Sequence, residues 1–189
     1  FILLDKWCYE NKIDCVYYLK EQIDNVGRSN EEYHNFKFID TRIVYALKLK
    51  RNVSINSKNN NIQTKLFKNM STRQLYKISD ENIKNTRFYI DKKFDIRLVK
   101  KMYRIWIDNS IKNSKSFLIS AELNNKIIGF ITYDIIDIDV AQIGLVAINR
   151  NKQNMGVASV LMLDCISRCR QQNIMKITVA TQIKNHPAK

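Results

Sequence analysis

Residues 143–160 read IGLVAINRNKQNMGVASV, in which a short apolar segment leads into a polar loop and then into a helix-like pattern. Gly156 allows the backbone to come close to a bound group, and Ala158 keeps the turn uncrowded. The helix that follows offers unpaired N–H groups and the positive end of its dipole, which together favour an anion. The stretch therefore predicts a strand, a phosphate-binding loop and a helix.

Two common phosphate-binding motifs are missing from the sequence. It has no G-K-[ST] of a P-loop and no G-x-G-x-x-G of a dinucleotide fold. What remains is a Q-x-x-G-x-A pattern at Gln153, Gly156 and Ala158, placed directly after an apolar strand. In strand, loop and helix together, this resembles the GCN5-related N-acetyltransferases, which use acetyl-coenzyme A. The alternative is a glycine that only starts a helix.

The resemblance implies a role for each part of this segment. The loop amides would hold the coenzyme A pyrophosphate, which assigns coenzyme contacts to Gln153, Asn154, Met155, Gly156, Val157, Ala158 and Ser159. The preceding strand would pair with the pantetheine arm through Leu145, Val146 and Ala147. The backbone N–H of Val146 is expected to stabilise the developing oxyanion.

The implied reaction is direct acyl transfer, in which a neutral amine attacks the thioester carbonyl and the thiolate leaves. The resemblance places the general acid, a Tyr, on a helix that Asn185 opens, beyond the last residue Lys189. Because the sequence ends before this Tyr, we interpret residues 73–189 as an acetyltransferase domain truncated at its C-terminus. The first residue, Phe1, is likewise not an initiator Met. Asn185 is expected to contact the coenzyme, to cap the next helix, or both.

The general base has no sharp candidate, and a water path to bulk solvent is an alternative. The groups considered are Glu122, Asp134, Asp137, Asp139, His34 and His186. The pair Asp137 and Asp139 has the pattern of a solvated turn, and the two histidines lie in the N-terminal segment and at the end of the chain.

Four further segments, residues 36–43, 87–91, 102–111 and 174–189, resemble the sugar-directed members of the family. Those members imply an acceptor of the dTDP-4-amino-4,6-dideoxygalactose type, a nucleotide-linked amino sugar. Arg87 would then pair with a diphosphate, and Tyr89 and Asp91 would line the acceptor wall. The same three residues could instead anchor a structural turn. The sequence does not choose between a sugar amine, a protein N-terminus and a small-molecule amine such as a polyamine.

The order of the predicted elements favours an α/β (α+β) fold with a mixed, mostly antiparallel sheet flanked by helices. We expect helices at 95–113 and 156–172, weaker ones at 70–75 and 80–86, and strands at 117–122, 126–135, 140–148 and 174–181. In the helix at 95–113, the expected packed positions are Leu98, Met102, Ile105, Trp106 and Ile111. Trp106 is thus predicted to belong to the core.

Upstream of this domain the sequence predicts two further regions. Residues 1–51 are expected to form a small N-terminal α/β domain, with strands at 13–19 and 36–49 and a capping box that starts at Ser29. Residues 52–72 are polar and rich in Asn, which favours a linker.

The chain carries 32 basic and 18 acidic side chains, a formal net charge of +14. Basic residues are spread along the chain and not gathered in a tail. Such a field would concentrate polyanions such as coenzyme A and a nucleotide sugar, although biased codon usage explains it equally well. A basic nucleic-acid-binding module is the alternative from another class, but no aromatic and basic stripe supports it.

The four cysteines, Cys8, Cys15, Cys165 and Cys169, show no C-x-x-C spacing, so we expect no metal site. No apolar stretch is long enough to predict a membrane span, and no signal peptide is recognised. These observations predict a cytoplasmic enzyme without a membrane anchor, and they leave a homodimer open.

Overall fold

The computed structural model describes residues 2–19, 36–50, 61–68, 71–183 and 185. The chain divides into two compact units, residues 1–39 and 40–189. In the first unit, residues Ile2–Glu10 form helix α1, none of whose side chains is buried. The predicted strand at 13–19 is wrong, because residues 13–19 form neither helix nor strand. The capping box at Ser29 and His34 lie outside the described residues.

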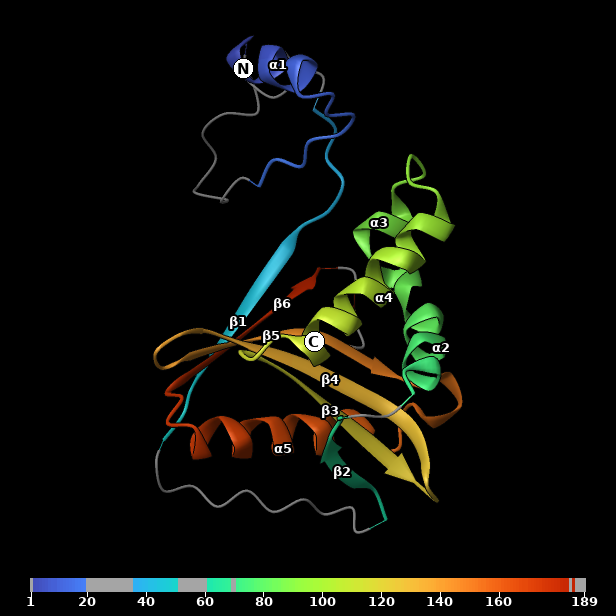
Figure 1. Cartoon of the computed structure of the whole chain (residues 1–189), viewed down its shortest axis with the longest axis vertical. Helices are drawn as coiled ribbons and strands as arrows, with labels where there is room; N and C mark the ends of the chain where they lie inside the picture. Colours follow the sequence, from blue (N-terminus) through green and yellow to red (C-terminus); the bar gives the residue numbers. More distant parts are fainter. Residues whose placement is uncertain (1, 20–35, 51–60, 69–70, 184, 186–189) are drawn as a thin grey trace. The chain divides into compact units, whose positions relative to one another are not determined.

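The second unit is built on one six-stranded sheet with the order β1-β6-β5-β4-β3-β2 (Figure 1). The strands are β1 (Arg42–Lys48), β2 (Gln63–Leu66), β3 (Ser116–Leu123), β4 (Lys126–Asp137), β5 (Val140–Ile148) and β6 (Lys176–Gln182). Only β5 and β6 run parallel, and every other neighbouring pair is antiparallel. The predicted mixed, mostly antiparallel sheet is therefore confirmed.

Helices cover both faces of this sheet. They are α2 (Arg73–Asn82), α3 (Arg87–Ile90), α4 (Ile96–Lys112) and α5 (Val157–Gln171), with short 3₁₀ turns η2 (Ile83–Asn85) and η3 (Arg150–Lys152). Figure 1 shows α5 on one side of the sheet and α2 with α4 on the other. Strand alternation explains this, because Ile119 and Ile131 pack with α5 while Leu118 and Phe130 pack with α2 and α4.

The strand hairpin and the helix boundaries agree with the sequence. Strands β3 and β4 are joined through Asn124 and Asn125, whose φ angles of 51° and 60° suit a tight hairpin turn. Helix α4 begins after Asp95, whose side chain accepts a hydrogen bond from Arg97 N, and ends at Lys112. The two weaker helix predictions, 70–75 and 80–86, correspond to one continuous helix α2 followed by η2.

The packed face of α4 differs from the predicted one. The side chains buried there are Val99, Tyr103, Ile107 and Ser110. Leu98, Ile105 and Trp106, which the periodicity placed in the core, are instead 63%, 48% and 38% exposed. The helix carries apolar residues around most of its circumference, so spacing alone could not select the buried stripe.

The domain boundaries also differ from those expected. Strand β1 pairs antiparallel with β6, from Arg42 opposite Gln182 to Lys48 opposite Lys176, so it belongs to the main sheet and not to a separate small domain. Strand β2, inside the predicted linker, pairs antiparallel with β3. Residues 52–60 and 69–70 of that predicted linker lie outside the described residues. Both strands pair with partners distant in sequence, which local composition does not reveal.

Candidate active site

The two parallel strands β5 and β6 are paired over only part of their length. Their partners run from Val140 opposite Lys176 to Ile143 opposite Val179. Within the described residues 140–183, no β5–β6 pair follows, although β5 continues along β4 to Ile148 and β6 continues along β1 to Gln182. Residues 144–148 and 180–182 therefore present backbone edges to each other without pairing. We call this gap in the sheet the β5–β6 opening.

Backbone alternation shows which groups of β5 face the opening. Asn149 N donates to Ile128 O at 2.8 Å, so residue 149 points its amide at β4. In an antiparallel ladder the direction alternates, and Ala147, opposite Phe130, also points at β4. The N–H and C=O groups of Val146 and Ile148 therefore point away from β4, toward the opening.

A β-bulge adjusts β5 just before this point. The register with β4 shifts between Ile131 and Tyr133, and Leu145 N donates to Thr132 Oγ1 at 2.8 Å instead of following the regular ladder. A Cβ atom on Gly144 would lie 2.8 Å from Thr132 Oγ1, so only glycine fits without a shift. Thr132 is fully buried. Sequence reasoning missed this threonine, because a side-chain hydrogen bond at a bulge leaves no pattern in the sequence.

Helix α2 closes the far end of the opening. Asn82 Nδ2 donates to Ile148 O at 2.9 Å and to Ile78 O at 2.8 Å. Because the Ile148 carbonyl points toward the opening, this bond satisfies it and ties the end of α2 to β5. The backbone N–H and C=O of Val146 therefore face the opening between the bulge on one side and Asn82 on the other.

The segment from Asn149 to Gly156, the phosphate loop, leads from β5 into α5. Asn149 accepts a hydrogen bond from Asn151 N through its side chain, which starts the short turn η3. Asn154 and Gly156 have φ angles of 61° and 77°, a region that glycine and asparagine tolerate best. The sharp change of direction before α5 therefore depends on these two residues.

The first turn of α5 exposes donors without intrahelical acceptors. Its first helical bond runs from Val160 N to Gly156 O at 3.1 Å, so the amides of Val157, Ala158 and Ser159 precede the ladder. The side chains of Ala158 and Ser159 are exposed, Val157 is buried, and no acidic residue lies in this turn. Unpaired amide donors at the N-terminus of a helix favour an anion.

Aromatic side chains of α4 lie beside the same part of β5. The indole Nε1 of Trp106 would be 3.5 Å from a Cβ on Gly144, and the Trp106 ring stacks on Tyr103 with centroids 6.0 Å apart. Trp106 is therefore a partly exposed residue next to the bulge and not the core residue expected. Tyr103 is buried, and burial raises its pKa, so its hydroxyl stays protonated at neutral pH.

The residues predicted for the acceptor wall lie on and just after the short helix α3. The guanidinium carbon of Arg87 is 4.5 Å from the centroid of the Phe88 ring. Tyr89 is 40% exposed, and Asp91 Oδ1 accepts a hydrogen bond from Lys93 N at 3.1 Å. Phe88 packs in the cluster that also holds Leu145 of β5. Helix α3 thus belongs to the helical layer on the α2–α4 side of the sheet.

Asn185 lies just past the end of β6. Its Nδ2 donates to Thr181 Oγ1 at 3.1 Å, and its backbone N donates to Gln182 O at 3.0 Å. The helix predicted to follow, and His186, lie outside the described residues.

The carboxylates considered as bases do not converge on the opening. Glu122, on β3, forms an ion pair with Lys65 at 2.8 Å, and two strands separate it from the opening. Asp137 and Asp139 flank the β4–β5 turn, at the paired end of β5. Asp134 sits on β4 opposite Gln142, also before the bulge. Within the part of the chain that the structure describes, no carboxylate is placed as an obvious general base.

The two cysteines of α5 are buried, and the hydrogen bond between the Cys165 thiol and Cys169, together with burial, raises the pKa of the Cys165 thiol. That environment suits a packed side chain and not a nucleophile. Among the described residues, no group of three or more His, Cys, Asp or Glu side chains is arranged to hold a metal ion. None of the described helices has both the length and the apolar character needed to cross a membrane.

The sequence pattern of the acetyltransferase (GNAT) family matches residues 83–189, which contain the bulge, the opening and the phosphate loop. The chain belongs to the GNAT family. It is an acetyltransferase that uses acetyl-coenzyme A, as predicted from the strand, loop and helix. A comparison with curated proteins finds no match.

Solved structures of this fold resemble the chain at low sequence identity. PaiA N-acetyltransferase from Thermoplasma acidophilum, in complex with coenzyme A, is 18% identical with a TM-score of 0.54, covering 66% of this chain and 81% of that one. A GCN5-related N-acetyltransferase from Sphaerobacter thermophilus is 14% identical with a TM-score of 0.58, covering 82% and 46%. The chain therefore spans less than half of that protein.

A functionally unknown protein from Staphylococcus epidermidis is similar over more of the chain. It is 14% identical with a TM-score of 0.64, and the alignment covers 97% of this chain and 69% of that one. At these identities the likeness establishes the fold of the GNAT domain and not its acceptor.

Proposed function

We propose that this GNAT protein transfers the acetyl group of acetyl-coenzyme A directly to an amine, with the thioester held in the β5–β6 opening. The observation that carries the proposal is the loss of β5–β6 pairing after Ile143, directly before the phosphate loop. An extended pantetheine arm can complete the ladder there by main-chain hydrogen bonds, as an added strand does. Leu145, Val146 and Ala147 are proposed to line it, with the main-chain hydrogen bonds made by Val146, because Leu145 N bonds Thr132 and the backbone groups of Ala147 face β4.

The Val146 N–H is proposed to stabilise the tetrahedral intermediate. The direction of this N–H follows from the strand alternation that the Asn149 hydrogen bond defines. The bulge at Gly144 and Leu145 lies directly before Val146. As the amine nitrogen bonds to the acetyl carbon, negative charge builds on the thioester oxygen, and an N–H already aimed there costs no reorganisation. The C–S bond then breaks, and the thiolate takes a proton.

The pyrophosphate is proposed to bind at the first turn of α5. The amides of Val157, Ala158 and Ser159 lack helical acceptors, and the helix dipole adds to their attraction for anions. Gln153, Asn154, Met155 and Gly156 would complete this cradle. Asn185 is proposed to contact the coenzyme from the end of β6.

The acceptor is proposed to be the amine of a nucleotide-linked sugar, of the dTDP-4-amino-4,6-dideoxyhexose type. In support, Arg87, Tyr89 and Asp91 share the helical layer that packs on Leu145, so a ligand along that layer would reach β5 near the bulge. A protein N-terminus or another small amine is the alternative within the family. A cytoplasmic location and a homodimer stay predictions.

The coenzyme site is tested with Ala158→Glu against Ala158→Gln, using titration calorimetry with acetyl-coenzyme A. A carboxylate in the first turn stabilises a helix by about 0.3–1 kcal/mol but repels a bound phosphate. We expect Ala158→Glu to raise the free energy of unfolding slightly and to weaken acetyl-coenzyme A binding about tenfold, while Ala158→Gln changes both less. Unchanged affinity in Ala158→Glu would contradict a pyrophosphate at this turn.

The acceptor is tested on protein saturated with acetyl-coenzyme A. Thiol release is measured with a dTDP-4-amino-4,6-dideoxyhexose, a peptide with a free N-terminus and a polyamine, each with wild type and with Arg87→Gln. The proposal expects turnover with the nucleotide sugar and a raised KM in Arg87→Gln. Turnover with the peptide or the polyamine alone would retain the acetyltransferase and reject the sugar.

A further inference from the structure

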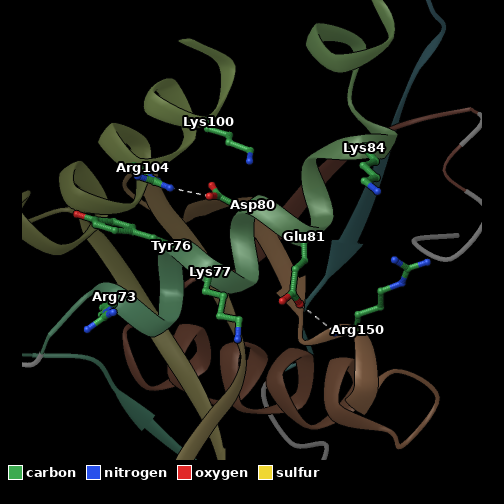
Figure 2. A pocket seen from close by; sticks show the side chains of 9 residues that line it. All are labelled: Arg73, Tyr76, Lys77, Asp80, Glu81, Lys84, Lys100, Arg104 and Arg150. Carbon is green, nitrogen blue, oxygen red and sulfur yellow. Dashed lines mark hydrogen bonds and ion pairs between the residues drawn. The ribbon is translucent and has the colours of Figure 1, made fainter. Parts of the chain in front are cut away.

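A second charged site lies among the helices that cover one face of the sheet. A cavity of about 480 Å³ lies between α2, α4 and the start of η3 (Figure 2). We call it the basic groove, and its lining residues are Arg73, Tyr76, Lys77, Asp80, Glu81, Lys84, Lys100, Arg104 and Arg150. Six of these nine side chains are cationic and two are acidic.

Most of the cations in the basic groove have no anionic partner. Arg104 Nη2 pairs with Asp80 Oδ2 at 2.6 Å, and Glu81 Oε2 accepts a bond of 3.4 Å from the backbone N of Arg150, not from its guanidinium. Among the described residues, no ion pair involves the side chains of Arg73, Lys77, Lys84, Lys100 or Arg150. A concave surface with unpaired charge of one sign focuses its field on an oppositely charged ligand.

The cations are arranged in a line and not around a point. Arg73 and Lys77 lie on α2, and Lys84 lies on the turn η2 that follows it (Figure 2). These residues are four and seven positions apart, which is about 16 Å at 1.5 Å per residue. Lys100 of α4 forms part of the other wall, and Arg150 belongs to the phosphate loop itself. A single phosphate would engage only part of this line. An extended chain of anions, at about 3.3 Å per residue, could follow all of it.

We propose that the basic groove binds an acidic segment of a polypeptide partner. The acidic groups of the groove favour a polypeptide over a nucleic acid. Asp80, which pairs with Arg104, and Glu81 both line the groove. A polypeptide offers an N–H donor at every residue in addition to its carboxylates, whereas a chain of phosphodiesters offers only acceptors, which these carboxylates repel.

The aromatic content of the groove points the same way. Binding of single-stranded nucleic acid normally uses exposed aromatic rings on which bases stack. Tyr76 is the one aromatic side chain in the lining, and its hydroxyl donates to Asp108 Oδ1 at 2.5 Å. The guanidinium carbon of Arg104 is 5.5 Å from the centroid of the same ring. Tyr76 thus joins α2 to α4 and does not present a free stacking face.

The binding test uses the full chain and a fluorescein-labelled oligoglutamate peptide, followed by fluorescence anisotropy at low ionic strength. We expect wild type to bind the peptide and to lose affinity as salt is added. The double variant Lys77→Glu with Lys84→Glu should bind about tenfold more weakly or worse. The matched control is Lys48→Glu with Lys176→Glu, two exposed lysines paired across β1 and β6, which should change affinity less than about twofold.

Three outcomes would overturn the proposal. The first is no peptide binding by wild type at low salt. The second is an equal loss in both double variants, which would assign binding to net charge alone. The third is tighter binding of an oligothymidylate of the same length, which would make the groove a nucleic-acid site. Circular dichroism confirms folding, and acetyl-coenzyme A titration of the groove variant should match the control, because neither Lys77 nor Lys84 belongs to the proposed coenzyme site.

Discussion

The two sides of β5 near the opening are constructed differently. The coenzyme side consists of backbone: the Val146 amide, the free amides of the first α5 turn, and the positive φ angles of Asn154 and Gly156. The helical side consists of side chains, with Trp106 beside Gly144, Arg87 over Phe88, and the cations of the basic groove. A backbone site survives most substitutions and depends on a few glycines. A side-chain site can change its ligand by single substitutions.

The largest expected effect comes from breaking the backbone side at Gly156. Gly156→Trp places a side chain at φ 77° and fills the space next to the first α5 turn. Loss of one or two N–H bonds to phosphate, each about 1.5–3 kcal/mol, should weaken acetyl-coenzyme A binding on the order of a hundredfold, measured by calorimetry.

The control for that change is Asn154→Gly, which removes a side chain while keeping a residue that tolerates φ 61°. It should bind acetyl-coenzyme A within a few-fold of wild type. A folded Gly156→Trp protein with normal affinity would show that the loop does not hold the coenzyme.

A smaller effect is expected where a side chain supports the backbone side. Thr132→Val removes the acceptor of the Leu145 N–H at 2.8 Å and leaves a buried donor unpaired. The free energy of unfolding should fall by about 1–3 kcal/mol, measured by urea denaturation. Acetyl-coenzyme A affinity should fall as well, because the bulge lies directly before Val146 in β5.

Thr132→Ser separates the hydroxyl from the methyl group. It keeps the acceptor for Leu145, so it should retain wild-type coenzyme affinity while losing about 1 kcal/mol of stability from the missing methyl. If Thr132→Ser lost affinity as much as Thr132→Val, packing and not the hydrogen bond would support the bulge.

The elements of the backbone side were also the ones predicted most accurately from the sequence. Strand β5 was predicted as 140–148 and α5 as 156–172, within a residue of the observed elements, because apolar runs and a glycine at a helix start act locally. The bulge was not predicted, although Gly144 marks it. A glycine in a strand signals close backbone approach, but the partner, Thr132, comes from a neighbouring strand.

The buried residues of the helical side were predicted less accurately from the sequence, for a physical reason. The ends of α4 were clear from Asp95 and Asn113, but its buried stripe contains Val99, Tyr103 and Ile107 and not the predicted set. Apolar residues on both stripes give the same period, and tertiary packing decides between them. The pairing of β1 with β6 was missed likewise, since it joins segments at opposite ends of the sequence.

The smallest expected effect is a change in tryptophan fluorescence. It tests whether the coenzyme side of β5 extends to Trp106 on the helical side. The chain has two tryptophans, Trp7 in α1 and Trp106 beside Gly144. If the coenzyme fills the opening next to the bulge, its binding should change the environment of the partly exposed Trp106 indole and therefore its emission. Trp7→Phe should keep this change on titration with acetyl-coenzyme A, and Trp106→Phe should lose it while binding with nearly the same affinity by calorimetry. A change that follows Trp7 would instead mean that the coenzyme signal comes from residues 1–39, and that Trp106 does not face the site.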